Sequence, residues 1–205
     1  MKINLENTGK KYNRDWIFRG ITTQISLNDS IVISGSNGSG KSTFLKMISG
    51  FETPTEGEIS YSENKEIPVE KIYKKVAYTS PYIGVFEEYT IEELLKFYST
   101  LKPLKNNIKF DQFIETIELT HTKNKAIKHF SSGMKQRVKL GLSILSDSPI
   151  LLLDEPTSNL DKNAILWYQN LVQKNLNNRI VIIASNNQKE ESFFCTKSID
   201  IEEFK

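Results

Sequence analysis

This sequence of 205 residues has a single cysteine, no long apolar run and no large excess of one charge. The single cysteine, Cys195, excludes an internal disulfide and a cysteine metal cluster, and its aromatic neighbours Phe193 and Phe194 favour a small core residue. No apolar run approaches the roughly 20 residues that cross a bilayer, and the N-terminus lacks a secretory pattern, so we expect a cytosolic chain. Because 27 basic residues balance 25 acidic ones, no nucleic-acid partner is expected.

A glycine-rich loop at residues 35–42 fits the pattern G-x-x-x-x-G-K-[ST]. It follows an apolar run at 31–33 and precedes a helical pattern at 43–48, which is the context of a phosphate-binding loop. Backbone N–H groups and the helix N-terminus of such a loop attract phosphate. Lys41 is expected to reach the β and γ phosphates of a nucleotide, and Ser42 to ligate Mg²⁺. The expected nucleotide-binding residues here are Gly35, Ser36, Asn37, Gly38, Ser39, Gly40, Lys41, Ser42 and Thr43. The alternative is a glycine-rich turn with an accidental Gly-Lys-Ser.

Two adjacent carboxylates follow four aliphatic residues at 150–153, a run that predicts a strand buried on both faces of a parallel sheet. Asp154 and Glu155 then stand at the carboxyl end of that strand, where open α/β sheets bind ligands. Asp154 is expected to hold Mg²⁺ through water, and Glu155 to act as general base for the attacking water. The alternative is a strand that simply ends in solvated acidic residues.

The segment at 130–134 reads Phe-Ser-Ser-Gly-Met and opens an amphipathic helical pattern. With the phosphate loop and the two carboxylates, it resembles the Leu-Ser-Gly-Gly-Gln signature of ATPase subunits of ATP-binding cassette (ABC) transporters. Ser131 and Gly133 match that signature, whereas the other three positions differ. The resemblance covers nearly the whole chain. For this segment taken alone, the alternative is an ordinary helix cap at Ser131.

The resemblance implies a site shared between two subunits, because the family's signature binds the γ-phosphate of ATP held by the opposite subunit. A homodimer, or a heterodimer with a second cassette, is therefore implied. Asp161 matches an aspartate that helps couple the two sites, but it fits equally well as the cap of the next helix. Tyr12 matches the aromatic that stacks on adenine, with Trp16 as the second candidate. The alternative for Tyr12 is a surface aromatic at a strand end.

Two positions depart from the family pattern. Pro81 falls where a glutamine normally touches Mg²⁺ and the attacking water, and proline has neither an amide side chain nor an N–H. That contact must be lost, made by Ser80, or left to water. Asn186 falls where a histidine contacts the γ-phosphate, and asparagine does not become cationic near neutral pH. We predict a slow ATPase with Glu155, Lys41 and Asn186 as catalytic residues, unless Asn186 fully replaces the histidine's hydrogen bond.

The fold class expected is α/β: a P-loop NTPase core with a mixed, mainly parallel sheet, an antiparallel β subdomain, and a helical subdomain that carries the signature motif. The chain is expected to be one domain, with its core at 1–81 and 149–205 and the helical subdomain at 82–148. A strand beginning near residue 2 and segments 21–27 and 57–61 are expected to be antiparallel. Strands are predicted within 76–81 and at 150–153, 180–184 and 198–201, and helices at 91–99, 110–117, 132–146 and 162–176.

The expected function is that of the ATP-binding subunit of an ABC transporter, which hydrolyses Mg–ATP at a head-to-tail dimer interface. Such a subunit drives a separate transmembrane permease and lies peripherally on the inner face of the cell membrane. We expect no extra regulatory domain after the last strand, which favours an exporter. An apolar group either docks the permease or packs the subdomain: Tyr82, Ile83, Val85, Phe86 and Tyr89. The alternatives are a soluble nucleotide-gated cassette that acts in assembly without transport, and an unrelated phosphate-loop kinase or GTPase.

Overall fold

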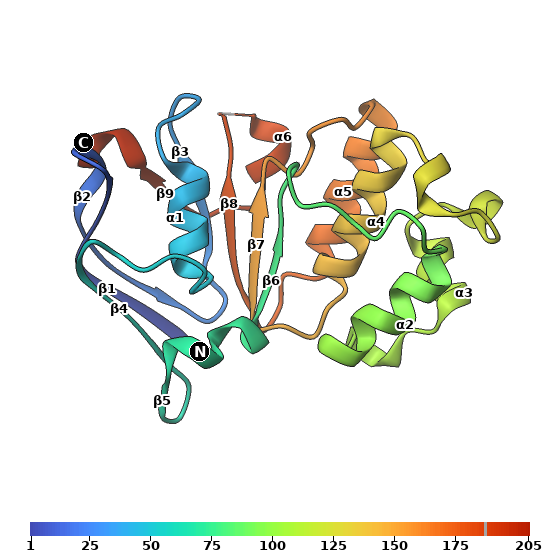
Figure 1. Ribbon diagram of the computed structural model, residues 1–205, viewed down its shortest axis with the longest axis horizontal. Coiled ribbons are helices and arrows are strands. Elements are labelled where there is room, and N and C mark those ends of the chain that lie inside the picture. The colour runs from blue at the N-terminus through green and yellow to red at the C-terminus, as the bar shows by residue number, and fades with distance from the viewer. Residues whose placement is uncertain (187) are drawn as a thin grey trace.

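The computed structural model describes residues 1–186 and 188–205, which form two sheets and a group of helices (Figure 1). One sheet has five parallel strands in the order β6-β7-β8-β3-β9, and the other has four antiparallel strands in the order β2-β1-β4-β5. The strands are β1 (Lys2–Tyr12), β2 (Asp15–Ser26), β3 (Ser30–Ser34), β4 (Glu56–Ser62), β5 (Glu66–Ile67), β6 (Val76–Thr79), β7 (Ile150–Asp154), β8 (Ile180–Ala184) and β9 (Lys197–Asp200). The helices are α1 (Lys41–Ile48), α2 (Ile91–Leu101), α3 (Phe110–Thr116), α4 (Ser132–Ile144), α5 (Lys162–Gln173) and α6 (Lys189–Ser192). The predicted α/β fold class is confirmed.

The parallel sheet separates two apolar cores. Successive residues of a strand point to opposite faces, and in β7 Leu151 and Leu153 pack with α2 to α5, while Ile150 and Leu152 pack with α1 and the antiparallel sheet. All five residues of β7 and of β8 are buried, as the predicted two-sided burial requires.

Functional segments meet at the carboxyl edge of the parallel sheet because the register aligns the strand ends. Asp154 of β7 pairs with Ala184 of β8, and Ala184 pairs with Ile33 of β3. The hydrogen bonds between the strands continue for one residue past the strand ends. The Glu155 N–H donates to the Ala184 carbonyl at 2.9 Å, and the Ser185 N–H donates to the Ile33 carbonyl at 3.1 Å. The phosphate loop, the two carboxylates and the segment at 185–186 therefore leave the sheet side by side.

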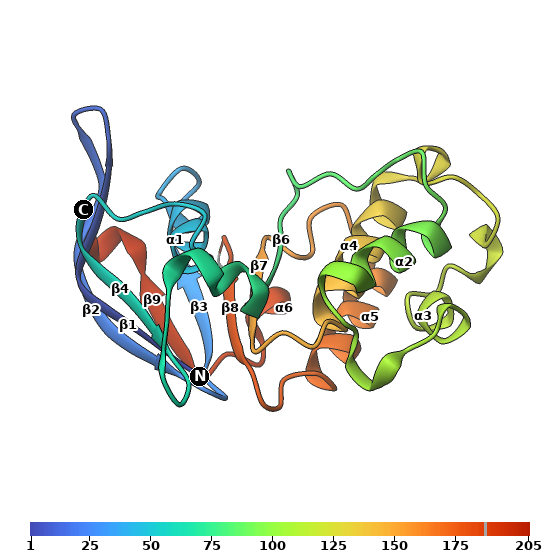
Figure 2. The ribbon, with the colours of Figure 1, turned by 60° about the horizontal axis from the view of Figure 1, so that its bottom comes forward.

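The helices α2, α3 and α4 lie on the side of the parallel sheet away from the antiparallel sheet (Figure 2). The capping box predicted for α2 is present: the Glu93 N–H donates to Thr90 Oγ1 at 3.3 Å, and the Thr90 N–H donates to Glu93 Oε2 at 2.8 Å. This helix runs to Leu101, two residues past its predicted end, whereas α4 and α5 end at Ile144 and Gln173, before the predicted 146 and 176. None of the helices in the described part of the chain has both the length and the apolar composition to cross a bilayer.

Arg179 explains why α4 ends early. Its guanidinium is 1% exposed and donates to the carbonyls of Ile144, Ser146 and Ser148 at 2.7 to 3.1 Å. Burial lowers the pKa of Arg179 to about 10. The side chain satisfies carbonyls that the end of α4 and the following loop leave open, and it thereby fixes the end of α4 and the loop before β7 to the start of β8.

Candidate nucleotide-binding and catalytic site

The phosphate loop joins β3 to α1 and takes a shape that only glycine allows at two points. Gly40 caps α1 with φ +111°, and a Cβ there would lie 2.3 Å from Ile17 Cγ2. Gly35 has φ +141°, and a Cβ there would lie 2.6 Å from Ser39 Oγ and 2.9 Å from Ile201 Cγ2. These glycines let the backbone close tightly enough for its N–H groups to face one centre.

Lys41 lies buried inside the curve of the loop. Its Nζ donates to the carbonyls of Gly35 and Ser36, each at 2.9 Å. Burial lowers the pKa of Lys41, against the opposing effect of Glu155 and Asp154. The ammonium group is thus held where phosphate oxygens would enter the loop.

Asp154 is 2% exposed and lies among oxygen groups. The Tyr78 hydroxyl donates to its Oδ2 at 3.2 Å. Burial raises the pKa of Asp154, while the hydroxyls of Ser42 and Tyr78 lower it. Hydroxyl and carboxylate oxygens are the ligands that Mg²⁺ prefers, usually one or two from the protein with phosphate and water completing the octahedron. Ser42 and Asp154 therefore fit a magnesium ion.

Glu155 follows β7 with φ +43° and faces Asn186. Asn186 Nδ2 donates to Glu155 Oε1 at 2.9 Å. The sequence predicted Asn186 as a partner of the γ-phosphate; in the structure its amide holds the carboxylate that was predicted to be the general base. Asparagine supplies here one hydrogen bond and no charge.

A pocket of about 380 Å³ gathers half of the predicted site residues. It is lined by Ile17, Asn37, Gly38, Gly40, Lys41, Ser42, Thr43, Pro81, Tyr82, Asp154 and Glu155. Three of these, Ile17, Pro81 and Tyr82, were not predicted as nucleotide contacts. The loop of residues 35–42 gives no signal for Ile17, which is brought there by the antiparallel sheet.

The aromatic candidates lie at the tip of the antiparallel sheet. Tyr12 is 43% exposed, its hydroxyl donates to Glu52, and burial and Glu52 raise its pKa. The Thr43 hydroxyl also contacts the Tyr12 hydroxyl, which places this side chain beside the start of α1. Trp16 instead has the Arg19 guanidinium 4.7 Å from its ring centroid. The position of Tyr12 next to Thr43 is compatible with adenine stacking, and stacking stays a prediction.

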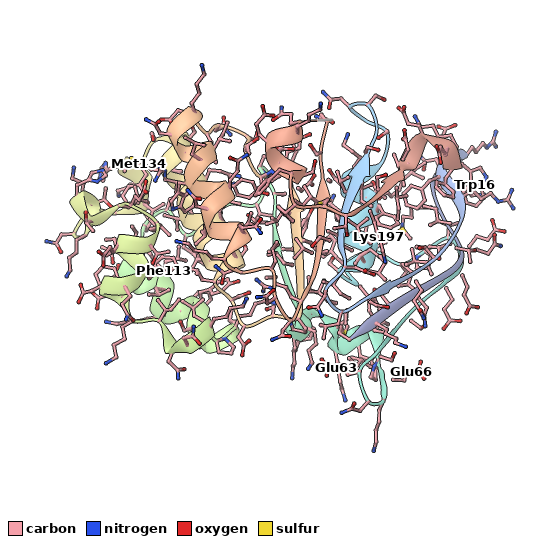
Figure 3. All side chains as sticks on the ribbon, turned by 180° about the vertical axis from the view of Figure 1, so that it is seen from behind. Trp16, Glu63, Glu66, Phe113, Met134 and Lys197 are labelled. Atoms are coloured by element: carbon pink, nitrogen blue, oxygen red, sulfur yellow. The ribbon has the colours of Figure 1, made fainter. Side chains whose placement is uncertain are left out.

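The signature segment lies away from this pocket. Ser131 caps α4 by accepting a hydrogen bond from the Met134 N–H at 3.2 Å, and Asp161 caps α5 by accepting one from the Ala164 N–H at 2.8 Å. Figure 3 shows Met134 and Trp16 toward opposite ends of the longest axis of the molecule. Both caps fit the alternatives stated above, and their roles toward ATP stay predictions. In the described part of the chain, the pocket at the phosphate loop includes none of Ser131, Gly133 and Asp161.

A contact that the sequence did not indicate involves Ser36. Its N–H donates to Glu202 Oε1 at 3.2 Å, and its hydroxyl donates to the same oxygen. Glu202 belongs to the 3₁₀ helix η5 (Ile201–Phe204), whose Ile201 packs against Gly35. The segment after β9 thus contacts the first two residues of the phosphate loop, Gly35 and Ser36.

Comparison with known proteins agrees with this arrangement. A family model described as "ABC transporter" matches residues 18–158. Among curated proteins, the maltose/maltodextrin import ATP-binding protein MalK of Mannheimia succiniciproducens is 31% identical, over 96% of this chain and 54% of MalK. The linearmycin resistance ATP-binding protein LnrL of Bacillus subtilis is 30% identical, over 95% of this chain and 64% of LnrL. The chain thus spans between about half and two thirds of the length of these relatives.

Solved structures share the fold. The ATP-binding subunit of an ABC transporter superposes with a TM-score of 0.81 at 21% identity, over 98% of this chain and 87% of that one. A dimeric, post-hydrolysis state of the ATP-binding cassette MJ0796 bound to ADP and Pi superposes with a TM-score of 0.77 at 20% identity, over 97% of this chain and 94% of that one. With its phosphate loop, acidic strand end and signature segment in the family's order, the chain belongs to the ABC transporter family as an ATP-binding, nucleotide-binding domain.

Proposed function

We propose that this chain hydrolyses Mg–ATP in the pocket at the phosphate loop and uses the cycle to drive a separate membrane-spanning subunit. The observation that carries the proposal is the convergence of Lys41, Ser42, Asp154 and Glu155 on one pocket of about 380 Å³. These side chains supply a phosphate-binding cation, two oxygens suited to Mg²⁺, and a carboxylate that can accept a proton.

Each residue has a distinct part in the reaction. Glu155 accepts a proton from a water molecule as that water's oxygen attacks the γ-phosphorus. The bond from the γ-phosphorus to the β–γ bridging oxygen breaks, which gives ADP and phosphate. Lys41 stabilises the charge that develops on the β and γ oxygens, and Ser42 and Asp154 would hold Mg²⁺. The metal, when bound, neutralises part of the triphosphate's charge.

A second cassette is proposed to complete the site. Gly38 and Tyr82 line the pocket and are exposed, and in residues 1–186 and 188–205 Ser131 and Gly133 do not line it. A head-to-tail pair would bring the exposed N-terminus of α4 from one copy to the triphosphate of the other, with Asp161 near the contact. A dimer is also named in the description of the MJ0796 structure, whose fold this chain shares.

The membrane subunit is proposed to dock in a hollow of about 800 Å³ next to the nucleotide pocket. Ser42, Tyr82 and Asp154 line both spaces, so a docked segment would lie against residues that contact the nucleotide. Tyr82 is 91% exposed and Ile83 also lines the hollow, whereas Val85 packs against the core of the helical part. Tyr89 and Phe86 stack on each other with ring centroids 5.4 Å apart. Of the predicted docking group, Tyr82 and Ile83 thus support the docking proposal, Val85 fits the packing alternative, and Phe86 and Tyr89 are exposed and fit either.

Such a chain would lie peripherally on the inner face of the cell membrane. The expected export direction stays a prediction, because relatives named for import and for resistance match the chain equally well, at 31% and 30% identity.

Slow turnover of ATP is also proposed. Pro81 lines the pocket without a side-chain amide, and Asn186 contacts Glu155 without a titratable proton.

The test measures ATP hydrolysis and mass in solution. Glu155→Gln should bind ATP, lose hydrolysis, and shift from monomer to dimer with Mg–ATP. Ser131→Arg added to that variant should abolish the dimer, because it puts a bulky cation at the tip of α4. Ser99→Arg, the same change at an exposed position of α2, is the matched control and should leave the dimer intact. Hydrolysis that survives in Glu155→Gln, or a dimer insensitive to Ser131→Arg, would contradict the proposal.

A further inference from the structure

A further, small cavity lies beside the nucleotide pocket and shares Glu155 with it. Its volume is about 30 Å³, and it is lined by Glu155, Ser158, Asn186, Gln188 and Glu191. Two buried polar atoms of its lining residues, Asn186 Oδ1 and Glu191 Oε2, have no hydrogen-bond partner among the residues that the structure describes. Buried polar atoms in native proteins nearly always have a partner, in the protein or in ordered water.

Glu191 is a buried carboxylate that hydrogen bonds hold in place. It is 2% exposed, and its Oε1 accepts hydrogen bonds from the Thr157 N–H at 3.1 Å and the Thr157 hydroxyl at 2.7 Å. The Tyr168 hydroxyl donates to the Glu191 backbone carbonyl at 2.9 Å. Glu191 thus joins α6, α5 and the loop that follows Glu155. Oε1 is hydrogen-bonded, whereas Oε2 makes no hydrogen bond with a described residue, although the buried Ser185 hydroxyl lies close enough to lower the pKa of Glu191.

The unpaired oxygen of Asn186 affects Glu155, because the side-chain amide can turn over and exchange the positions of Oδ1 and Nδ2. Its Nδ2 donates to Glu155 Oε1 at 2.9 Å. If the amide turned over, Oδ1 would face the carboxylate, and two acceptors would then repel each other. Whatever holds Oδ1 in place therefore also holds the donor on Glu155.

We propose that the cavity binds one internal water molecule, which bridges Asn186 Oδ1 and Glu191 Oε2 and makes Glu191 a positioning residue for Glu155. The volume of about 30 Å³ suits a single water, and the two unpaired atoms with the neighbouring side chains give it enough polar partners. An ionised Glu191 accepts from the water, and a protonated one donates to it. In both cases the water donates to Asn186. Burial raises the pKa of Glu191, and both of its protonation states retain the bridge.

The inference rests on the proposed role of Glu155 in hydrolysis, and it adds a chain of contacts from Glu191 through water and Asn186 to that carboxylate. The first test needs no activity. A high-resolution crystal structure of the wild-type protein should show a water within hydrogen-bond distance of Asn186 Oδ1 and Glu191 Oε2. A dry cavity, or an amide refined with Oδ1 toward Glu155, would overturn the proposal.

The second test is a double-mutant cycle on ATP hydrolysis. Glu191→Ala should lower kcat about tenfold, as expected for one hydrogen bond in a buried network, while KM for ATP stays within about twofold. Glu191→Gln keeps an oxygen for Thr157 and a group for the water, so it should restore kcat to within about twofold of wild type. Glu190→Gln, its exposed neighbour, is the matched control and should be unchanged.

The decisive comparison uses Asn186→Ala as background. If Glu191 acts through Asn186, adding Glu191→Ala there should lower kcat by less than about twofold. Additive effects would mean that Glu191 acts only through Thr157, and would overturn the proposal. Glu191→Gln and the crystallographic water still decide the matter if Glu191→Ala does not fold. A Glu155→Gln variant that still hydrolyses ATP would refute the function proposed for Glu155, and it would leave the water observation unaffected.

Discussion

Replacing Asn186 by alanine should slow ATP hydrolysis without weakening ATP binding. In the structure its Nδ2 donates to Glu155 Oε1 at 2.9 Å, a hydrogen bond to a charged acceptor. Hydrogen bonds to charged groups stabilise the groups they join by about 1.5 to 3 kcal/mol. The lower end applies here because Glu155 is partly exposed and water can replace the donor. About 1.5 kcal/mol corresponds to roughly a tenfold change in rate. We therefore expect kcat to fall about tenfold.

KM for ATP should stay the same, because Asn186 is absent from the residues described as lining the nucleotide pocket. Steady-state ATPase assays on the purified chain give both constants, and Asn124→Ala, at an exposed position, is the matched control. An unchanged kcat would show that the contact with Glu155 has no role in the reaction. A rise in KM alone would place Asn186 on the ATP instead of on the carboxylate, and would also refute the reasoning.

Replacing Asn186 by histidine extends the same argument to pH. An imidazole has an ordinary pKa of about 6.5, and a neighbouring carboxylate raises it. The variant should therefore show a change in kcat between about pH 6 and 8 that the wild type lacks at this position. Identical pH profiles for the two proteins would contradict this expectation.

Three further predictions follow from the site and the core. Tyr78→Phe removes the hydroxyl that donates to Asp154 at 3.2 Å, and should raise the Mg²⁺ concentration for half-maximal hydrolysis about tenfold; an unchanged titration would contradict it. Gly40→Ala puts a Cβ 2.3 Å from Ile17 at φ +111°, so calorimetry should show at least about tenfold weaker ATP binding, and wild-type affinity would refute the geometry. Arg179→Leu leaves buried carbonyls unpaired and should lower the free energy of unfolding by about 3 kcal/mol in urea, whereas a loss below about 1 kcal/mol would mean that water replaces the guanidinium.

Residues in the motifs were predictable because their chemistry is local. The loop from Gly35 to Ser42 and the pair Asp154 and Glu155 each carry their context in a few neighbouring positions, and the structure brings them to one pocket. The capping box at Thr90 is local in the same way. Where hydrogen bonds connect residues three or four apart, the sequence is sufficient to predict them.

Residues whose role depends on strand order were not predictable. Tyr78 reaches Asp154 because β6 is the neighbour of β7, although residues 80–149, which include α2, α3 and α4, separate the two strands along the chain. Glu190 and Glu191 are adjacent acids with the same local context, yet the first is exposed and the second is buried against Thr157. No periodicity separates them, because α6 has only four residues.

The signature helix is also hydrogen-bonded to the segment that follows the two carboxylates in its own copy. Gln136 of α4 is 1% exposed, and its Nε2 donates to the carbonyl of Pro156 at 2.9 Å, one residue after Glu155. A Cβ on Gly133 would lie 3.0 Å from the Asn159 carbonyl, so the tip of α4 touches the loop that leads to Asp161. If two copies pair head to tail as proposed, phosphate bound at the tip of α4 in one site presses on the segment that follows Glu155 in the other. Hydrolysis at either site would then change the position of the segment that follows Glu155 in the other site. The connection between α4 and that segment is the buried hydrogen bond from Gln136 to Pro156.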